Sequence, residues 1–347
     1  MSELKTNKIS TNDQNNVAID NALGLKSYTT TQMNALTSAA GDIIFNTTEE
    51  VPYFYNGTSW EELASPSIVV SSLVIAGGGG GSGAEGGGGG GAGGYRNSYA
   101  SETSGGGGST ETPLNIDLLT NYTVTVGAGG GSNTSGSNSE FSTITSIGGG
   151  RSGDGTNSAA AGTAGGSGGG AAGRGSNAGG AGTANQGFSG GNNAPGPLSD
   201  DDAGGGGGGA GAAGGNASNK NAGNGGAGLS SSITGSAVTR AGGAGGSTQN
   251  GSAGSGGTGG GANGVNSSST PGNGAVNTGS GGAGRGHPSG TAGSGGSGIV
   301  ILRWATADAT ITVGGGLTSS SATDGSDTVV TFTEGTGTIS FSWYNRR

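Results

Sequence analysis

The chain has 347 residues, of which 90 are glycine, and its formal net charge at pH 7 is −9. Glycine is about one residue in four, against a usual share of roughly 7%, whereas Leu, Ile, Val and Phe together make up only about 14%. That composition argues against an ordinary apolar globule, and the acidic balance argues against a basic nucleic-acid-binding surface. With no cysteine, the chain has no disulfide framework and no Cys-based metal site.

Residues 1–66 have an ordinary composition, which indicates a separate N-terminal module. The sequence 29–32 matches a capping box, and Met33 and Leu36 follow at helical spacing, so we expect a short helix there. Short strand patterns occupy 5–10, 17–20, 42–46, 52–55 and 58–63. The Asn56-Gly57 pair between two aromatic-rich runs is typical of a hairpin turn. The resulting small β meander is too small to be stable without copies of itself.

Residues 67–305 form the glycine-rich region, which begins and ends with an apolar strand. The first strand runs through 72–75 into a glycine tract, and the second spans 298–304. We expect these two strands to be neighbours in one folded unit. A flexible linker is the alternative, because each ordered glycine loses more backbone entropy than any other residue. Collagen is excluded, because glycine tracts such as 86–91 are unbroken and proline is scarce.

Glycine tracts can also form polyproline-II helices, which have three residues per turn and no internal hydrogen bonds. Their amides point outward, and without Cβ atoms the helices can approach closely enough to bond to one another. The sequence therefore predicts a polyglycine-II slab that is held together by backbone hydrogen bonds. Short apolar strands that feed glycine runs recur along the chain, at 122–131, 142–150, 232–243 and 310–316, as stacked layers require.

Residues 306–347 return to strand patterns and are predicted to form a C-terminal β cap. Val330 and Phe332, and then Ile339 and Phe341, alternate with Thr and Ser, and a turn is expected over 334–337. The predicted fold class is therefore mainly β and irregular, with three segments: an N-terminal meander with a short helix, the glycine slab, and this cap.

Two parts of the chain resemble proteins of tailed bacteriophages. The segment 40–63 resembles a stretch that is common in their tail-fibre and other virion proteins, and this resemblance implies a homotrimer. The ordered series of strand and glycine motifs between 72 and 304 is similar to the glycine-rich domain of phage tail-fibre tips. That resemblance implies a polyglycine-II sandwich whose intervening loops bind receptors on the bacterial surface.

The segments that interrupt glycine with larger side chains are the predicted receptor contacts, since aromatic and Arg side chains anchor interfaces and stack on sugars. These residues are Tyr95, Arg96, Tyr99, Phe188, Asn192, Asn193, Leu198, Arg285 and His287. The alternative for each of them is that it turns the chain or fills the end of a layer.

The sequence offers little for catalysis or cofactors. Matches to Gly-x-Gly-x-x-Gly carry no information in a chain so rich in glycine, and no helix follows them. His287 is the only histidine, so it lacks the partners of a catalytic or metal site. The acidic run 200–202 could ligate calcium, but it has no EF-hand spacing, and a solvated acidic loop is the better explanation. We expect no enzyme activity, no cofactor and no dedicated metal site.

The sequence thus favours a virion structural protein, a tail-fibre or adhesin component that attaches to a host glycan or outer-membrane protein. The N-terminal module would bind other virion proteins. The beginning of the chain lacks the apolar core of a secretion signal, which suits synthesis in the host cytoplasm. Two alternatives stay open, a capsid decoration or head fibre and a non-viral structural glycine-rich protein.

Overall fold

The computed structural model describes residues 24–63, 67–83, 85–154, 161–173, 175–194, 202–267, 269–286 and 291–343. The chain divides into two compact units, unit 1 (Met1–Pro66) and unit 2 (Ser67–Arg347). The strand patterns at 5–10 and 17–20 lie outside the described residues.

Unit 1 is a small β meander with one short helix, as the sequence predicts. Its elements are β1 (Ser27–Tyr28), α1 (Thr30–Asn34), β2 (Ile43–Asn46), β3 (Val51–Tyr55) and β4 (Trp60–Glu62), in the sheet order β1-β2-β3-β4. The capping box is confirmed: Thr29 accepts from the amide of Gln32, and the Gln32 side chain accepts from that of Thr29. The parallel pairing of the two-residue β1 with β2 has no sequence pattern that would predict it.

The apolar core of unit 1 is minimal. Among its described residues only Met33 and Ile44 are buried apolar side chains, and Ile43 is 48% exposed. A fully buried Asn46 organises the turn after β2, where its Oδ1 accepts the Thr48 amide at 2.9 Å. So little buried apolar surface supports the expectation that this unit is stabilised by copies of itself.

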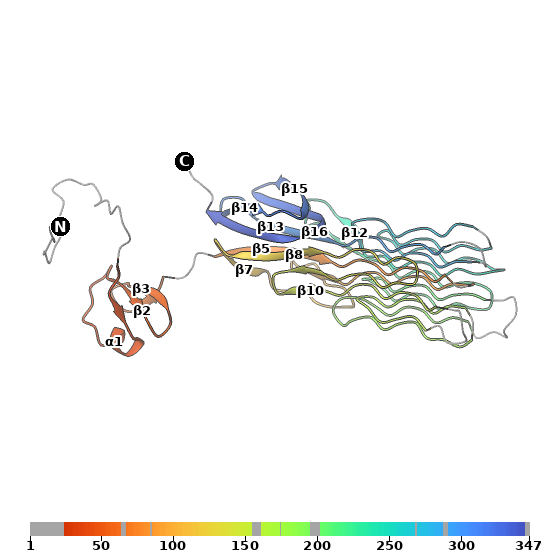
Figure 1. The fold of residues 1–347 in the computed structure, drawn as a ribbon, viewed down its shortest axis with the longest axis horizontal. Helices are drawn as coiled ribbons and strands as arrows, with labels where there is room; N and C mark the ends of the chain where they lie inside the picture. Colours follow the sequence, from red (N-terminus) through yellow and green to blue (C-terminus); the bar gives the residue numbers. More distant parts are fainter. Residues whose placement is uncertain are drawn as a thin grey trace. The chain divides into compact units, whose positions relative to one another are not determined.

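Unit 2 contains a ten-stranded sheet at one end and glycine-rich segments that run to the other end (Figure 1). The sheet consists of β5 (Ser67–Ile75), β6 (Tyr95–Asn97), β7 (Leu114–Asp117), β8 (Asn121–Val126), β9 (Ser139–Phe141), β10 (Ile144–Ser146), β13 (Ile299–Ala305), β14 (Ala309–Val313), β15 (Leu317–Asp324) and β16 (Asp327–Trp343). A separate hairpin pairs β11 (Leu229–Ser231) with β12 (Val238–Arg240). The main path runs β10-β9-β8-β16-β13-β5-β6. The predicted pairing of the two apolar strands is confirmed, because β5 and β13 are antiparallel neighbours.

The turn predicted over 334–337 is wrong, because β16 is one continuous strand of 17 residues. Gly335 has a φ of +99°, and the pairing with β15 shifts register by one residue, so Thr333 is an extra, bulged residue. One inserted residue reverses which side chains face inward. Phe332 and Ile339, seven positions apart, can therefore enter the same core. β16 also pairs with β13 and β8, so the C-terminal strands belong to the main sheet.

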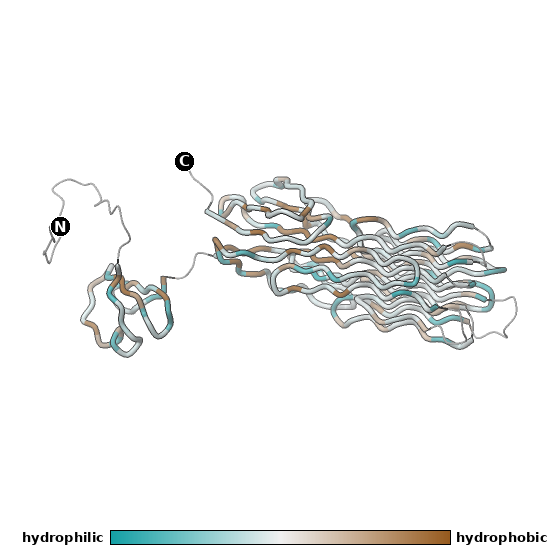
Figure 2. The backbone as a smooth tube through the Cα atoms, in the orientation of Figure 1, coloured by the Kyte–Doolittle hydropathy of each residue, from teal (hydrophilic) through white to brown (hydrophobic). Residues whose placement is uncertain are grey.

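The sheet end of unit 2 has a conventional apolar core. Trp304 packs edge-on against Phe341 at 5.2 Å between ring centroids, and its Nε1 donates to the Ala309 carbonyl. A second cluster, which includes Ile75, Tyr95 and Ile301, lies where the strands pass into the glycine segments. Figure 2 shows the hydrophobic colouring concentrated in the strands of unit 2 and pale colouring along its glycine segments.

The glycine end is built as polyglycine-II helices, as predicted. In the segment 77–82, residues three apart bond to the same neighbour, which is the period of a threefold helix. Its amides donate to three segments, 134–137, 293–296 and 88–91. Its carbonyls accept from three others, 130–133, 149–152 and 282–285. Backbone hydrogen bonds therefore hold this segment on all sides without any side-chain core.

The close approach of these helices leaves no space for a side chain at most of the interior glycines, although small side chains such as those of Ala244 and Ala283 are buried at other positions. A Cβ added at Gly90 would lie well within 3.0 Å of the Gly79 carbonyl oxygen, and one at Gly207 would lie equally near that of Gly90. At the slab surface, where a neighbouring helix is missing, asparagine side chains accept amides instead. These are Asn133, Asn138, Asn192, Asn216, Asn221, Asn224, Asn263 and Asn273.

Candidate functional site

The end of unit 2 opposite the sheet is formed by the loops that join the glycine helices (Figure 1). We call these the far-end loops; their described residues are 83, 85–86, 175–178, 192–194, 202–203, 218–221, 248–252 and 286. The loops contact one another, since Thr248 Oγ1 donates to the Lys220 carbonyl at 2.7 Å and Gly86 donates to the Gly286 carbonyl. Because the chain enters unit 2 at Ser67 in the sheet, these loops form the end remote from that entry.

Two predicted contact residues lie in the far-end loops and a third directly precedes one of them. Asn192 is exposed, and its Oδ1 accepts the Gly179 amide at 3.0 Å. Asn193 is only 4% exposed, and its side chain bonds to the backbone of two residues of the 175–178 loop. Arg285 is half-buried, and its amide donates to the Ser82 carbonyl. Leu198 and His287 lie outside the described residues.

The other predicted contacts lie toward the sheet end. Tyr95 is completely buried, so its side chain is not available for contact with a receptor. Tyr99 is half-buried, with the Arg303 guanidinium 5.0 Å from its ring centroid. Arg303 in turn bonds to Asp324 and Asp327, both at 2.8 Å, so Tyr99 is part of a stabilising cluster.

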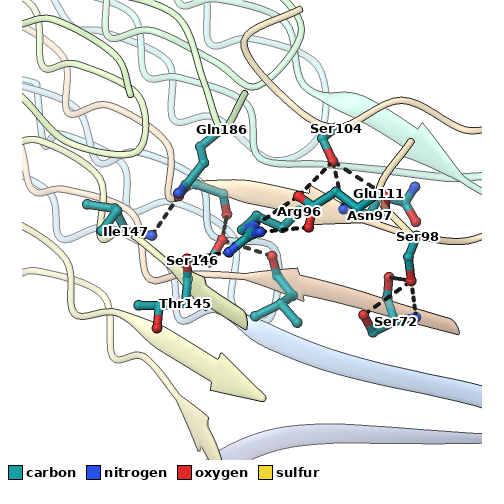
Figure 3. A network of polar contacts seen from close by, with 12 residues as sticks. Ser72, Arg96, Asn97, Ser98, Ser104, Glu111, Thr145, Ser146, Ile147 and Gln186 are labelled. Atoms are coloured by element: carbon teal, nitrogen blue, oxygen red, sulfur yellow. Dashed lines mark hydrogen bonds and ion pairs between the residues drawn. The ribbon is translucent and has the colours of Figure 1, made fainter. Parts of the chain in front are cut away.

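Arg96 lies beside a polar hollow, where its side chain is held rigidly (Figure 3). Its Nε and Nη2 donate to the two carboxylate oxygens of Glu111 at 2.9 and 2.8 Å, and its Nη1 donates to the Thr145 carbonyl at 3.3 Å. The Glu111 carboxylate also accepts from Ser104 Oγ at 3.2 Å. This bidentate pair fixes both side chains and cancels their charges.

The structure brings together two segments that the sequence analysis treats as separate contact loops, 95–99 and 185–188. Gln186 is uncharged and lines the same hollow as Arg96. Its Oε1 accepts the Ile147 amide at 2.8 Å (Figure 3). With Asn185 and residues 109–112 these side chains line a hollow of about 620 Å³. We call it the β6 groove, defined by Arg96, Gly107, Ser109, Thr110, Glu111, Thr112, Ala184, Asn185 and Gln186.

A smaller, more apolar hollow of about 200 Å³ adjoins the β6 groove and shares Gly107 with it. The half-buried ring of Phe188, another predicted contact residue, lines this hollow together with Leu229. An aromatic side chain therefore lies next to a set of hydrogen-bonding groups.

The importance of Glu111 was not predicted. It lies 15 residues beyond Arg96 in a stretch without a repeating pattern, and only the folded chain shows that the two pair. A nearby run of Ser, Thr and Glu, 109–112, is the one sequence signal that could have drawn attention to this surface.

No group of three or more His, Cys, Asp or Glu side chains suited to a metal ion occurs in the described part of the chain. Of the acidic run that left calcium open, Asp202 is 7% exposed and its carbonyl accepts from Thr248 Oγ1, while Asp200 and Asp201 lie outside the described residues. Among the described residues no helix is long and apolar enough to span a membrane.

Comparison with family models gives two matches. Residues 56–305 match the glycine-rich domain, and residues 8–75 match the phage tail like trimerisation region. The first covers well over half of the chain, which therefore belongs to the glycine-rich domain family. Together the two matches indicate a phage tail-fibre-like structural protein. The match to the trimerisation region supports a homotrimer and a place in the virion tail. Comparisons with curated proteins and with solved structures gave no match.

Proposed function

We propose that this protein attaches the virion to the host surface through the far-end loops of unit 2. The observation that carries the proposal is that these loops lie at the end of unit 2 remote from the chain entry at Ser67, on a slab that is held together mainly by backbone hydrogen bonds. Specificity can then vary in the loops while backbone pairing keeps the scaffold folded.

Unit 1 would supply the trimer and the link to other virion proteins. The match of residues 8–75 to a trimerisation region and the small core around Met33 and Ile44 both support this assignment. We propose a structural and binding role without a catalytic step. The tail match favours a tail fibre over a capsid decoration, and immunogold microscopy of virions against unit 1 distinguishes the two locations.

A blocking experiment tests the far-end loops directly. Because the chain has no cysteine, a single cysteine can be labelled cleanly with maleimide-polyethylene glycol. Ser218→Cys places the label in an exposed far-end loop, and Ser320→Cys places it on exposed β15 in the sheet. Purified full-length protein in excess should compete with virions for host cells.

The label on Ser218→Cys should abolish this competition, and the label on Ser320→Cys should leave it intact. Equal competition by both labelled proteins would show that the far-end loops are not the contact surface. Failure of even the unlabelled protein to compete would count against host attachment as a whole.

A further inference from the structure

We propose that the β6 groove is a binding site for a neutral saccharide, separate from the far-end loops. The groove lies beside β6, where the sheet passes into the glycine segments, and it shares no residue with those loops, so the inference does not depend on the proposed attachment surface. Its volume of about 620 Å³ is within the range of small-molecule sites, roughly 300–1,000 Å³.

The groove presents hydrogen-bonding groups that the protein itself does not use. The Ile147 amide can only donate, so Gln186 must direct its Oε1 to it and keep Nε2 as a donor. Among the described residues, the side chains of Ser109, Thr112 and Asn185 have no hydrogen-bond partner. Hydroxyls and amides of this kind donate and accept, as the hydroxyl groups of a sugar do.

The charge of the groove selects a neutral ligand. Among the described residues that line it, Arg96 and Glu111 are the only charged ones, and they are paired bidentately. An anionic sugar would have to compete with Glu111 for the guanidinium, whereas a neutral hydroxyl can use the lone pairs and N–H groups that remain. The Phe188 ring in the adjoining hollow offers an apolar face for the C–H side of a sugar.

The backbone around the groove argues against a bound peptide strand. Strand addition needs an open sheet edge, and β6 is an edge strand of the main path. Its outward groups are nevertheless occupied: the Tyr95 amide donates to the Gln186 carbonyl, and the Asn97 carbonyl accepts the Glu111 amide at 2.9 Å. The Tyr95 carbonyl and the Asn97 amide are also bonded, to Gly105 and Ser104. Recognition in the groove therefore depends on side chains.

Two substitutions test the site with little risk to folding. Asn185 has a φ of +60°, which glycine adopts without strain, so Asn185→Gly removes the amide and keeps the backbone. Asn277→Gly is the matched control, because Asn277 has a φ of +58° and does not line the groove. Glu111→Gln keeps the shape of the carboxylate but leaves the Arg96 charge uncompensated.

The experiment is saturation-transfer NMR on the full-length protein in its solution oligomer. The probes are glucose, galactose, mannose and N-acetylglucosamine as neutral sugars, glucuronate as an acidic sugar, and the peptide Ser-Asn-Gly-Thr. We expect transfer to at least one neutral sugar with a Kd on the order of 1 mM. Asn185→Gly should weaken it by about tenfold or more, and Asn277→Gly should bind as the unmodified protein does. Glu111→Gln, if its melting temperature is unchanged, should shift preference toward glucuronate.

The inference is overturned if no neutral sugar receives saturation, if only the peptide does, or if the two Asn→Gly variants bind equally. If Glu111→Gln unfolds the protein, the Asn185→Gly comparison still decides. Saccharide binding in the β6 groove is measured on purified protein, and competition through the far-end loops is measured on cells. A negative result in one experiment therefore leaves the other proposal unaffected.

Discussion

The two ends of unit 2 achieve stability in opposite ways. The sheet end buries large side chains such as Phe332, Phe341 and Trp304, so its free energy of folding comes largely from apolar burial. The glycine end buries backbone against backbone, and most of its interior glycines have no room for a Cβ. The first should be damaged most by removing atoms, and the second by adding them.

The comparison also explains why so low an apolar content suffices. Each glycine helix satisfies its amides and carbonyls with surrounding helices, which offsets the entropy lost in ordering glycine. The few large apolar residues can then be concentrated in the sheet. The cluster around Ile75 and Tyr95, where strands pass into glycine helices, joins the two kinds of core.

The largest effect is expected from adding a side chain inside the slab. Gly90→Val would force carbon atoms into the Gly79 carbonyl, and because the obstacle is backbone the helices must separate. We expect destabilisation of more than about 5 kcal/mol, with loss of the slow amide hydrogen exchange of the glycine end. Gly131→Val is the control, because Gly131 is exposed and a Cβ there meets nothing within 4 Å. Exchange rates by mass spectrometry report the outcome, and equal protection in both variants would contradict the backbone-packed interior.

The next largest effect is expected from removing a side chain in the sheet. Phe341 is fully buried and packs against Trp304, so Phe341→Ala should lower the free energy of unfolding by about 3–5 kcal/mol. Trp343→Ala on the same strand should change it by less than about 1 kcal/mol, because Trp343 is 58% exposed. Denaturant unfolding measures both. If the two substitutions cost the same, the apolar core is not what stabilises this end.

A moderate effect is expected at Arg303, which links the two ends. Its Nη1 donates to the Ile233 carbonyl, beyond the β11 strand, at 3.0 Å, and its guanidinium bonds to Asp324 and Asp327. Arg303→Lys keeps the charge and loses the planar fork, so we expect a loss of about 1–3 kcal/mol, reduced by the partial exposure of both carboxylates. Arg151→Lys is the control and should cost less than about 1 kcal/mol, because the Arg151 guanidinium donates only a weak hydrogen bond, at 3.3 Å, to the carbonyl of its neighbour Ser152. Thermal unfolding at low and high salt measures both, and identical values would exclude a linking role for Arg303.

The sequence could predict those features of the two ends that are marked by distinctive side chains. The pairing of β5 with β13 was predictable because both strands are apolar runs that adjoin glycine tracts. The capping box at Thr29 and the Asn56-Gly57 hairpin were predictable because their signals are local. The bulge in β16 was not, since glycine at 335 and 337 is compatible with a turn and with a positive-φ bulge alike.

The arrangement of the glycine helices was not predictable either. A tract such as 77–81 has no side chains to mark which residue faces which neighbour, so only the threefold period can be inferred. For the same reason the β6 groove could not be predicted. Arg96 and Gln186 lie in segments that were predicted to make contacts, but their proximity to Glu111 depends on how the glycine helices pack. The asparagines that cap surface amides are a signal that sequence reasoning could have used.

The smallest effect is expected at Tyr95, where the two ends meet. Its ring is fully buried, and among the described residues its hydroxyl makes no hydrogen bond of good geometry. Tyr95→Phe should therefore be neutral or stabilising by up to about 1 kcal/mol at neutral pH. Burial, with a further contribution from the charge of Glu102, raises the pKa of Tyr95 above its usual value near 10.

A raised pKa in the folded state means that the unfolded chain loses this proton first as the pH rises. The contribution of Tyr95 to stability is therefore constant below about pH 10 and falls above it. In Tyr95→Phe the free energy of unfolding should therefore fall less above about pH 10 than in the unmodified protein. In Tyr99→Phe, which alters a half-buried ring, it should fall as in the unmodified protein. Unfolding measured between pH 8 and pH 11 separates the two variants. If the free energy of unfolding of both variants had the same pH dependence, Tyr95 would be accessible to water. The junction between the apolar core of the sheet and the glycine slab would then be hydrated.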